Sequence, residues 1–111
     1  MKSKEQIVEK FLKALNVEDF KTAKNCLNDD FSFKGPLGER NGADKYIEDM
    51  KKMRFKYEID QIFSNENDVC VIYKIDMSGK AKIETCGIYK LEKDKLSSLN
   101  VIFDPRKVLA E

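Results

Sequence analysis

Apolar residues near the start of the chain recur every three to four positions. The residues that share this spacing are Ile7, Val8, Phe11, Leu12 and Leu15. Side chains spaced in this way lie along one side of a helix, which we expect over residues 4–15. Ser3 and Gln6 carry the pattern of a capping box at its start, because the serine can accept from the third amide while the glutamine reaches back.

A second, shorter helix is expected after the first, with Asn16 or Asp19 as its capping residue. Its apolar side carries Phe20, Ala23 and Leu27. We expect it to stop at the polar residues 28–30, whose side chains compete with the helix by local hydrogen bonding.

The period of the pattern then changes from helix to strand. Phe31 and Phe33 alternate with polar neighbours, which predicts a short strand that ends at a turn over residues 35–38. Residues 41–42 mark a further turn. Helical spacing then returns and predicts a third helix over residues 43–53. Its apolar positions are Ala43, Tyr46, Ile47, Met50 and Met53.

The remainder of the chain is predicted to form four strands in series. Their expected ranges are 55–63, 69–77, 81–92 and 96–103. Short polar turns separate them, which implies an antiparallel meander, and Pro105 ends the last strand because proline cannot donate to the ladder. On the first of these strands, one face should carry Phe55, Tyr57, Ile59 and Phe63. The order of helices and strands predicts an α+β fold.

Composition and charge indicate one folded domain, residues 1–111. The chain has 111 residues, of which 41% are hydrophobic, enough to form a single core. Its 21 basic and 20 acidic residues nearly cancel and are interspersed, whereas nucleic-acid binding calls for a face of one sign. No apolar run is long enough to span a bilayer, and charges such as Lys4 and Glu5 interrupt the start, where a signal peptide would be apolar. We therefore expect a cytoplasmic protein that binds neither nucleic acid nor membrane.

Cysteine and histidine content limits the chemistry. Cys26, Cys70 and Cys86 are widely spaced and include no Cys-x-x-Cys, so neither a disulfide framework nor a zinc site is indicated. The chain has no histidine, which excludes Ser-His-Asp and Cys-His nucleophiles, histidine general bases and histidine-ligated metals. We expect no metal and no cofactor.

The residues at the junctions between these elements resemble the nuclear transport factor 2-like superfamily, most closely its SnoaL-like and ketosteroid-isomerase-like branch. The matching positions are residues 11–16, Asp19, residues 27–31, residues 35–38 and residues 41–42. The resemblance covers nearly the whole chain. It implies a cone-shaped, cystatin-like fold in which three N-terminal helices pack on a curved antiparallel sheet and leave a conical pocket. Because that family holds isomerases, cyclases, dehydratases, hydrolases and non-enzymatic modules, the resemblance specifies the fold more than the function.

The catalytic residues of related enzymes are not matched by this sequence. The resemblance places Phe11 where ketosteroid isomerases have an oxyanion-donating tyrosine, Gly35 where they have the aspartate base, and Gly87 where they have a protonated aspartate. Phenylalanine and glycine can neither donate nor take a proton, so that mechanism is not expected here. Dehydratase-type members use histidines, which the chain lacks. The Asp-Arg-Asp cluster of the epoxide hydrolases is not expected either, since a turn, a helix end and the tail should hold Arg40, Arg54 and Arg106.

Strand alternation indicates which side chains would face the pocket of such a fold. The expected wall consists of Phe11, Leu15, Phe33, Tyr46, Met50, Val71, Tyr73, Tyr89, Val101 and Phe103. Tyr73 and Tyr89 lie on neighbouring strands, where both hydroxyls could converge on one polar atom of a ligand. The same side chains could instead be core residues, and a water or a backbone carbonyl could serve the two phenols equally well.

Functions from different classes are compatible with this pattern. The first is a pocket that binds a small, largely apolar molecule, since the expected wall contains no charged residue. The alternative is a non-catalytic dimerisation or scaffold module whose cone is filled by its own side chains, and a protein-recognition module is a third. A ligand-binding pocket needs an open cone, so the volume of the cavity separates the first two.

The strands also indicate a surface for a partner. Residues 69–72 and 101–103 are apolar without alternation, which implies burial on both faces of the sheet. The helices can cover only the concave face, so the outer face would expose an apolar patch. Its expected residues are Cys70, Ile72, Cys86, Ile88 and Ile102. We expect a second copy of the chain to cover this patch and form a homodimer.

Overall fold

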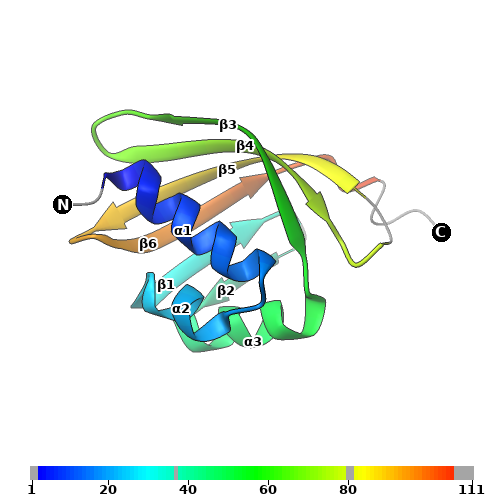
Figure 1. Cartoon of the computed structure of the whole chain (residues 1–111), viewed down its shortest axis with the longest axis horizontal. Coiled ribbons are helices and arrows are strands. Elements are labelled where there is room, and N and C mark those ends of the chain that lie inside the picture. The colour runs from blue at the N-terminus through cyan, green and yellow to red at the C-terminus, as the bar shows by residue number, and fades with distance from the viewer. Residues whose placement is uncertain (1–2, 37, 80–81, 107–111) are drawn as a thin grey trace.

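The computed structural model describes residues 3–36, 38–79 and 82–106, which form two layers. Three helices lie against one face of a strongly bent six-stranded sheet (Figure 1). The helices are α1 (Lys4–Asn16), α2 (Phe20–Asn25) and α3 (Ala43–Met53). The strands are β1 (Leu27–Gly35), β2 (Gly38–Asn41), β3 (Lys56–Ser64), β4 (Asp68–Asp76), β5 (Lys82–Glu92) and β6 (Lys95–Ile102). This arrangement confirms the predicted α+β fold class.

Side-chain hydrogen bonds begin each of the first two helices. The Ser3 side chain accepts from the Gln6 N–H at 3.1 Å, and the Gln6 side chain accepts from the Ser3 N–H at 3.0 Å, so the predicted capping box is confirmed. Asp19, rather than Asn16, caps α2 by accepting from a backbone N–H in its first turn at 3.2 Å. Asn16 instead bonds to the backbone of Tyr57 at the start of β3.

The strands are arranged in the order β2-β1-β6-β5-β4-β3. Every neighbouring pair is antiparallel except β1 and β6, which run parallel. These two strands come from distant parts of the chain, so no hairpin fixes their relative direction. Figure 1 shows α1 crossing the sheet, with α2 and α3 packed beside β1 and β2.

The first strand begins earlier than the sequence predicted. β1 starts at Leu27, so the polar residues 28–30 lie in a strand and α2 ends at Asn25. The prediction that Leu27 belongs to the helix is therefore wrong. Long-range pairing decides the boundary, because Leu27 pairs with Leu96 of β6, whose N–H donates to the Cys26 carbonyl at 2.8 Å.

A short strand replaces the turn that was expected around Arg40. β2 pairs with β1 in the register Phe33↔Arg40, so the prediction that Arg40 lies in a turn is wrong. The four residues of β2 carry no apolar alternation, and only their pairing with β1 defines them as a strand. Two predicted positions, Leu37 in the turn and Ala81 at the start of the third strand of the meander, lie outside the described residues.

A β-bulge reverses the faces of β3 at its middle. The register with β4 shifts between Ile59 and Gln61, which leaves Asp60 as the extra residue. Tyr57 is buried on the concave face, whereas Phe63 lies on the outer face and is 51% exposed. The prediction that Tyr57 and Phe63 share a face is therefore wrong, because one extra residue moves every later side chain to the opposite face.

The core lies between the helices and the concave face of the sheet. Side chains along β4 alternate as predicted, and those buried under the helices are Val69, Val71, Tyr73 and Ile75. The residues between them, including Cys70 and Ile72, are half-buried on the outer face. On β6, Val101 is buried and Ile102 is 54% exposed, which confirms the alternation predicted for that strand.

Candidate functional site

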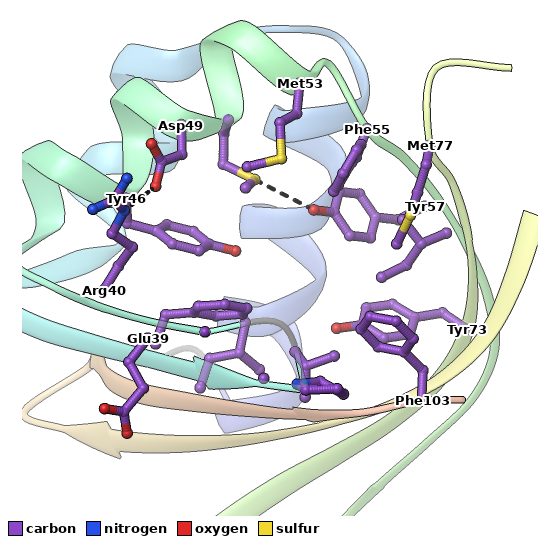
Figure 2. A pocket seen from close by; sticks show the side chains of 18 residues that line it. Glu39, Arg40, Tyr46, Asp49, Met53, Phe55, Tyr57, Tyr73, Met77 and Phe103 are labelled. Atoms are coloured by element: carbon purple, nitrogen blue, oxygen red, sulfur yellow. Dashed lines mark hydrogen bonds and ion pairs between the residues drawn. The ribbon is translucent and has the colours of Figure 1, made fainter. Parts of the chain in front are cut away.

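A cavity of about 450 Å³ lies between α3 and the concave face of the sheet (Figure 2). Its apolar and aromatic wall residues are Phe33, Gly35, Pro36, Gly38, Tyr46, Met50, Met53, Phe55, Tyr57, Tyr73, Ile75, Met77, Leu99, Val101 and Phe103. Three charged residues complete the wall: Glu39, Arg40 and Asp49. This volume is within the range of pockets that hold small molecules in proteins.

Helix and strand periodicity bring these side chains to the same space. The wall residues of α3 are three or four positions apart and share one side of the helix: Tyr46, Asp49, Met50 and Met53. The wall residues of β4 and β6 are two positions apart and share the concave face: Tyr73, Ile75, Leu99 and Val101. The cavity is therefore formed where one side of α3 faces alternate residues of the sheet.

Three phenol groups point into the cavity. Figure 2 shows the hydroxyls of Tyr46, Tyr57 and Tyr73 directed toward a common space. The Tyr57 hydroxyl donates to Met50 Sδ at 3.5 Å. The Tyr73 hydroxyl oxygen lies 2.9 Å from that of Tyr89. All four tyrosines of the chain thus belong to one cluster.

Burial keeps these phenols protonated. It is the largest cause that raises the pKa of all four, Tyr46, Tyr57, Tyr73 and Tyr89, above the ordinary value for tyrosine. The hydrogen bond with Tyr89 lowers the pKa of Tyr73, but by less than burial raises it. At neutral pH the tyrosine cluster therefore presents O–H groups and no phenolate.

An ion pair stands where the cavity meets solvent. Arg40 Nε donates to Asp49 Oδ2 at 2.6 Å, with the Arg40 side chain 54% exposed and that of Asp49 18% exposed. Glu39, next to Arg40, is exposed. The wall was expected to contain no charged residue. The structure adds these three at its edge: Glu39 and Arg40 come from β2, where a turn was expected, and Asp49 comes from the side of α3 that carries Tyr46.

The positions compared with ketosteroid isomerases carry no polar side chain into the cavity. Gly35 is part of the wall, while the ring of Phe11 is fully buried with its centroid 6.4 Å from that of Tyr89. At Gly87, an added Cβ would overlap the Tyr73 hydroxyl and lie 3.0 Å from Tyr89 Cε1. The two tyrosines thus occupy the space that a side chain at position 87 would need.

The ten residues predicted to face the pocket lie in two places. Those in the cavity wall are Phe33, Tyr46, Met50, Tyr73, Val101 and Phe103. Those in the core outside the wall are Phe11, Leu15, Val71 and Tyr89. Tyr73 and Tyr89 converge on each other, so Tyr89 is linked to the cavity through Tyr73.

Sequence reasoning missed several wall residues that had a usable signal. Asp49 lies three positions after Tyr46, so helical spacing alone places the two on neighbouring parts of α3. Alternation assigned Tyr57 to one face of its strand, but it did not show that this face lines the cavity. The pairing of Tyr57 with Ile75 of β4 places it there. Met77 follows β4 by one residue and extends the buried alternation of that strand.

The chemical groups of the site are protonated phenols, the thioethers of Met50, Met53 and Met77, the Arg40–Asp49 ion pair and the exposed carboxylate of Glu39. Among the described residues, no three His, Cys, Asp or Glu side chains are gathered in a way that could hold a metal ion. Within residues 3–36, 38–79 and 82–106, no helix is long and apolar enough to cross a membrane. Such groups can orient a polar atom on an otherwise apolar molecule.

The sequence matches the SnoaL-like domain over residues 8–99. The chain belongs to the SnoaL-like family. This SnoaL-like domain is 46% identical to a nuclear transport factor 2-like protein of unknown function from Cytophaga hutchinsonii, with a TM-score of 0.92 over 97% of this chain and 98% of that one. No protein of curated function matches the sequence. The predicted resemblance to the nuclear transport factor 2-like superfamily is thereby confirmed.

More distant solved structures share the fold of this SnoaL-like domain. An LEH-like epoxide hydrolase from Mycobacterium tuberculosis has a TM-score of 0.80 at 21% identity, over 93% of this chain and 84% of that one. An uncharacterised cystatin-fold protein from Novosphingobium aromaticivorans has a TM-score of 0.82 at 17% identity, over 92% and 99%. At these identities the likeness extends to the fold alone.

Proposed function

We propose that this SnoaL-like domain binds a small, largely apolar molecule in the cavity between α3 and the sheet. The observation that carries the proposal is the open volume of about 450 Å³ with a mainly apolar and aromatic wall. Small-molecule pockets in proteins have this size and a few polar groups that fix the orientation of the ligand. A cone filled by its own side chains, which the scaffold alternative requires, would leave no such volume.

Apolar contact should supply most of the affinity. Removing apolar surface from water stabilises by roughly 25 cal/mol per Å², and Phe33, Phe55 and Phe103 offer aromatic surface to a ligand. A neutral hydrogen bond to Tyr46 or Tyr73 would add a net contribution of only about 0.5–1.5 kcal/mol. The phenols should therefore determine orientation more than affinity.

Native mass spectrometry of the freshly purified protein tests for a retained molecule, and a thermal-shift screen of apolar aromatics and lipids tests for binding. A ligand at a hundred times its Kd should add about 2.7 kcal/mol of stability. Met53→Trp at the cavity edge and Val101→Trp in its wall should abolish the shift by filling the volume. Val17→Trp is the matched control, because Val17 is 66% exposed at the end of α1.

Two outcomes would contradict the proposal. If no compound shifts the melting temperature and the tryptophan variants in the cavity are merely destabilised, the domain acts as a scaffold. If small carboxylates shift the melting temperature while apolar aromatics do not, the Arg40–Asp49 pair rather than the apolar wall governs binding.

We also propose that the domain does not isomerise steroids through the ketosteroid isomerase residues. Phe11, Gly35 and Gly87 support this, since none of them can exchange a proton. The one carboxylate of the wall with a largely buried side chain, Asp49, is paired with Arg40. Assay of a β,γ-unsaturated steroid ketone should show no turnover. Appreciable turnover that Asp49→Asn abolishes would show that this carboxylate serves as the base.

A further inference from the structure

Tyr73 and Tyr89 form a polar link between the cavity and the core. Their hydroxyl oxygens are 2.9 Å apart; Tyr73 lines the cavity, while Tyr89 lies behind it and is fully buried. Among the residues that the structure describes, Tyr73 is the hydrogen-bond partner of the Tyr89 hydroxyl. Each phenol carries one proton, so the direction of this bond decides which proton remains for a ligand.

The burial of Tyr89 favours one direction. If Tyr73 donated, the Tyr89 proton would be buried without an acceptor among the described residues, which folded proteins rarely tolerate. If Tyr89 donates, its proton is used, and the Tyr73 proton is left at a hydroxyl that points into the cavity (Figure 2). Burial raises the pKa of both groups, so each phenol keeps its proton at neutral pH.

Tyr46 supplies a second proton to the same space. The single proton of Tyr57 is donated to Met50 Sδ at 3.5 Å, so it is not available to a ligand without breaking that bond. Burial is the largest cause that raises the pKa of Tyr46, so its hydroxyl keeps its proton at neutral pH. Figure 2 shows the hydroxyls of Tyr46 and Tyr73 pointing from opposite sides into the same part of the cavity.

The absence of a side chain at Gly87 makes room for the contact between Tyr73 of β4 and Tyr89 of β5. A Cβ at position 87 would overlap the Tyr73 hydroxyl and approach Tyr73 Cζ to 3.1 Å. The missing side chain therefore leaves the space in which the hydroxyls of Tyr73 and Tyr89 meet.

We infer that the cavity takes molecules that present a hydrogen-bond acceptor, such as a ketone or aldehyde oxygen, to the protons of Tyr73 and Tyr46, and that Tyr89 is a positioning residue that orients Tyr73. The inference rests on the proposed function, because it names the class of ligand for the same cavity. A hydroxyl that accepts one hydrogen bond becomes a stronger donor in the next. The Tyr89–Tyr73 pair therefore favours an acceptor over a ligand group that must itself donate.

A matched pair of probes separates this inference from apolar binding. Acetylnaphthalene and ethylnaphthalene, substituted at the same ring position, have nearly the same shape, and only the first has an acceptor. Their Kd values are measured by calorimetry for the wild type and for Tyr73→Phe, Tyr46→Phe and Tyr89→Phe. The carbonyl stretch of the bound, isotope-labelled ketone is recorded by infrared difference spectroscopy, since its shift reports the strength of the hydrogen bond.

Tyr73→Phe should weaken ketone binding about 3–10-fold, as expected for one neutral hydrogen bond, and leave hydrocarbon binding unchanged. Tyr46→Phe should also weaken ketone binding and leave hydrocarbon binding unchanged. Tyr89→Phe should reduce the infrared shift to a value between those of the wild type and Tyr73→Phe, an effect that loss of packing alone would not produce. Thr85→Val is the control, because the buried Thr85 hydroxyl on β5 already donates to the Ile83 carbonyl at 3.0 Å.

Each other outcome overturns a defined part of the inference. If both probes bind and Tyr73→Phe changes neither the ratio of their Kd values nor the carbonyl stretch of the bound ketone, Tyr73 is not a hydrogen-bond donor to the ligand. The proposal of an apolar pocket then still stands. If Tyr73→Phe removes the shift and Tyr89→Phe leaves it intact, the positioning role of Tyr89 is wrong. If neither probe binds the wild type, the proposed function fails together with the inference. Circular dichroism of each variant verifies that the fold is kept.

Discussion

All four tyrosines of the chain gather in one cluster, with side chains from α3 and three strands of the sheet. Their exposed fractions are at most 9%, and the rings of Tyr57 and Tyr73 contact each other at a tilt of 36°, with their centroids 5.5 Å apart. Removing such phenols from water penalises the charged form, which raises the pKa of each. The cluster therefore belongs both to the cavity wall, through Tyr46, Tyr57 and Tyr73, and to the buried core.

The domain should lose stability as the pH rises above about 10, the ordinary pKa of tyrosine. The folded-state pKa values lie above the unfolded value, so the unfolded chain releases protons first and is favoured as the pH increases. Below pH 10 this contribution to stability is fully present. Near-ultraviolet absorbance should show no tyrosinate until one cooperative step that coincides with loss of circular dichroism. Gradual titration near pH 10 with an intact fold would contradict burial of the cluster.

Gly87→Ala should destabilise the domain by about 1–3 kcal/mol, because the new methyl group would overlap the Tyr73 hydroxyl. Tyr73→Phe in the same chain should recover part of this loss by removing the nearest oxygen. A urea-unfolding cycle of the two single variants and the double variant measures the coupling, expected at about 0.5–3 kcal/mol. Gly35→Ala is the control, since its Cβ would meet a Phe33 ring that can turn aside, at 3.1 Å. If the effects of Gly87→Ala and Tyr73→Phe on the free energy of unfolding simply add in the double variant, the new methyl group does not overlap the Tyr73 hydroxyl.

At the scale of elements, one side chain fastens the end of α1 to the edge of the sheet. Asn16 Nδ2 donates to the Tyr57 carbonyl at 2.8 Å, and Asn16 Oδ1 accepts from the Tyr57 N–H at 2.7 Å. β3 is an edge strand, so these backbone groups have no neighbouring strand on that side. The asparagine amide replaces the missing partner and helps to hold the start of β3, which carries Tyr57 into the cavity wall.

Asn16→Ala should lower the free energy of unfolding by about 1–3 kcal/mol, because two part-buried backbone groups lose their partners. Asn16→Asp should not restore the stability, since a carboxylate can accept from the Tyr57 N–H but cannot donate to its carbonyl. Asn25→Ala serves as the control at the exposed end of α2 and should change stability by less than about 0.5 kcal/mol. Midpoints of urea unfolding measure all three. An aspartate variant as stable as the wild type would show that the donated bond is unimportant.

At the scale of the whole molecule, the outer face of the sheet carries two apolar rows that cross neighbouring strands. The first row pairs Phe63, Cys70 and Ile88, and the second pairs Ile72, Cys86 and Ile102. The Cys70 and Cys86 sulfur atoms are 3.2 Å apart between the rows. The described helices lie on the opposite face and leave this patch to solvent in the single chain.

We propose that a second copy of the chain covers this outer face. The sequence pattern predicted such a partner for Cys70, Ile72, Cys86, Ile88 and Ile102, and the bulge in β3 adds Phe63 to them. Covering large apolar side chains stabilises by roughly 1.5–3 kcal/mol each when burial is complete, so several together can offset an association cost of about 4–15 kcal/mol. Light scattering should give twice the chain mass of 12.9 kDa. Ile72→Lys and Ile102→Lys should shift the protein toward monomer by burying a charge, whereas Val17→Lys, on the helical side, should not. A monomeric wild type, or unchanged mass in both outer-face variants, would count against the dimer.

The sequence by itself determined the kind and order of most elements and the faces of the regular strands. The helical spacing of residues 43–53 and the capping box at Ser3 are local patterns, and both are confirmed. Alternation along β4 correctly placed Tyr73 toward the helices, because side chains of a strand point to opposite faces in turn. The absence of histidine restricted the chemistry without any knowledge of the fold.

Only the tertiary structure decided where strands begin, where a bulge moves side chains to the other face of the sheet, and which polar groups contact each other. The start of β1 at Leu27 and the existence of β2 depend on pairing with distant segments, and the bulge at Asp60 turned Phe63 to the outer face. The cavity wall gained Asp49, and Tyr89 was paired with Tyr73 rather than placed in that wall. The physical reason is that periodicity reports a residue's neighbours along one element, whereas register, closure and convergence are properties of contacts between elements.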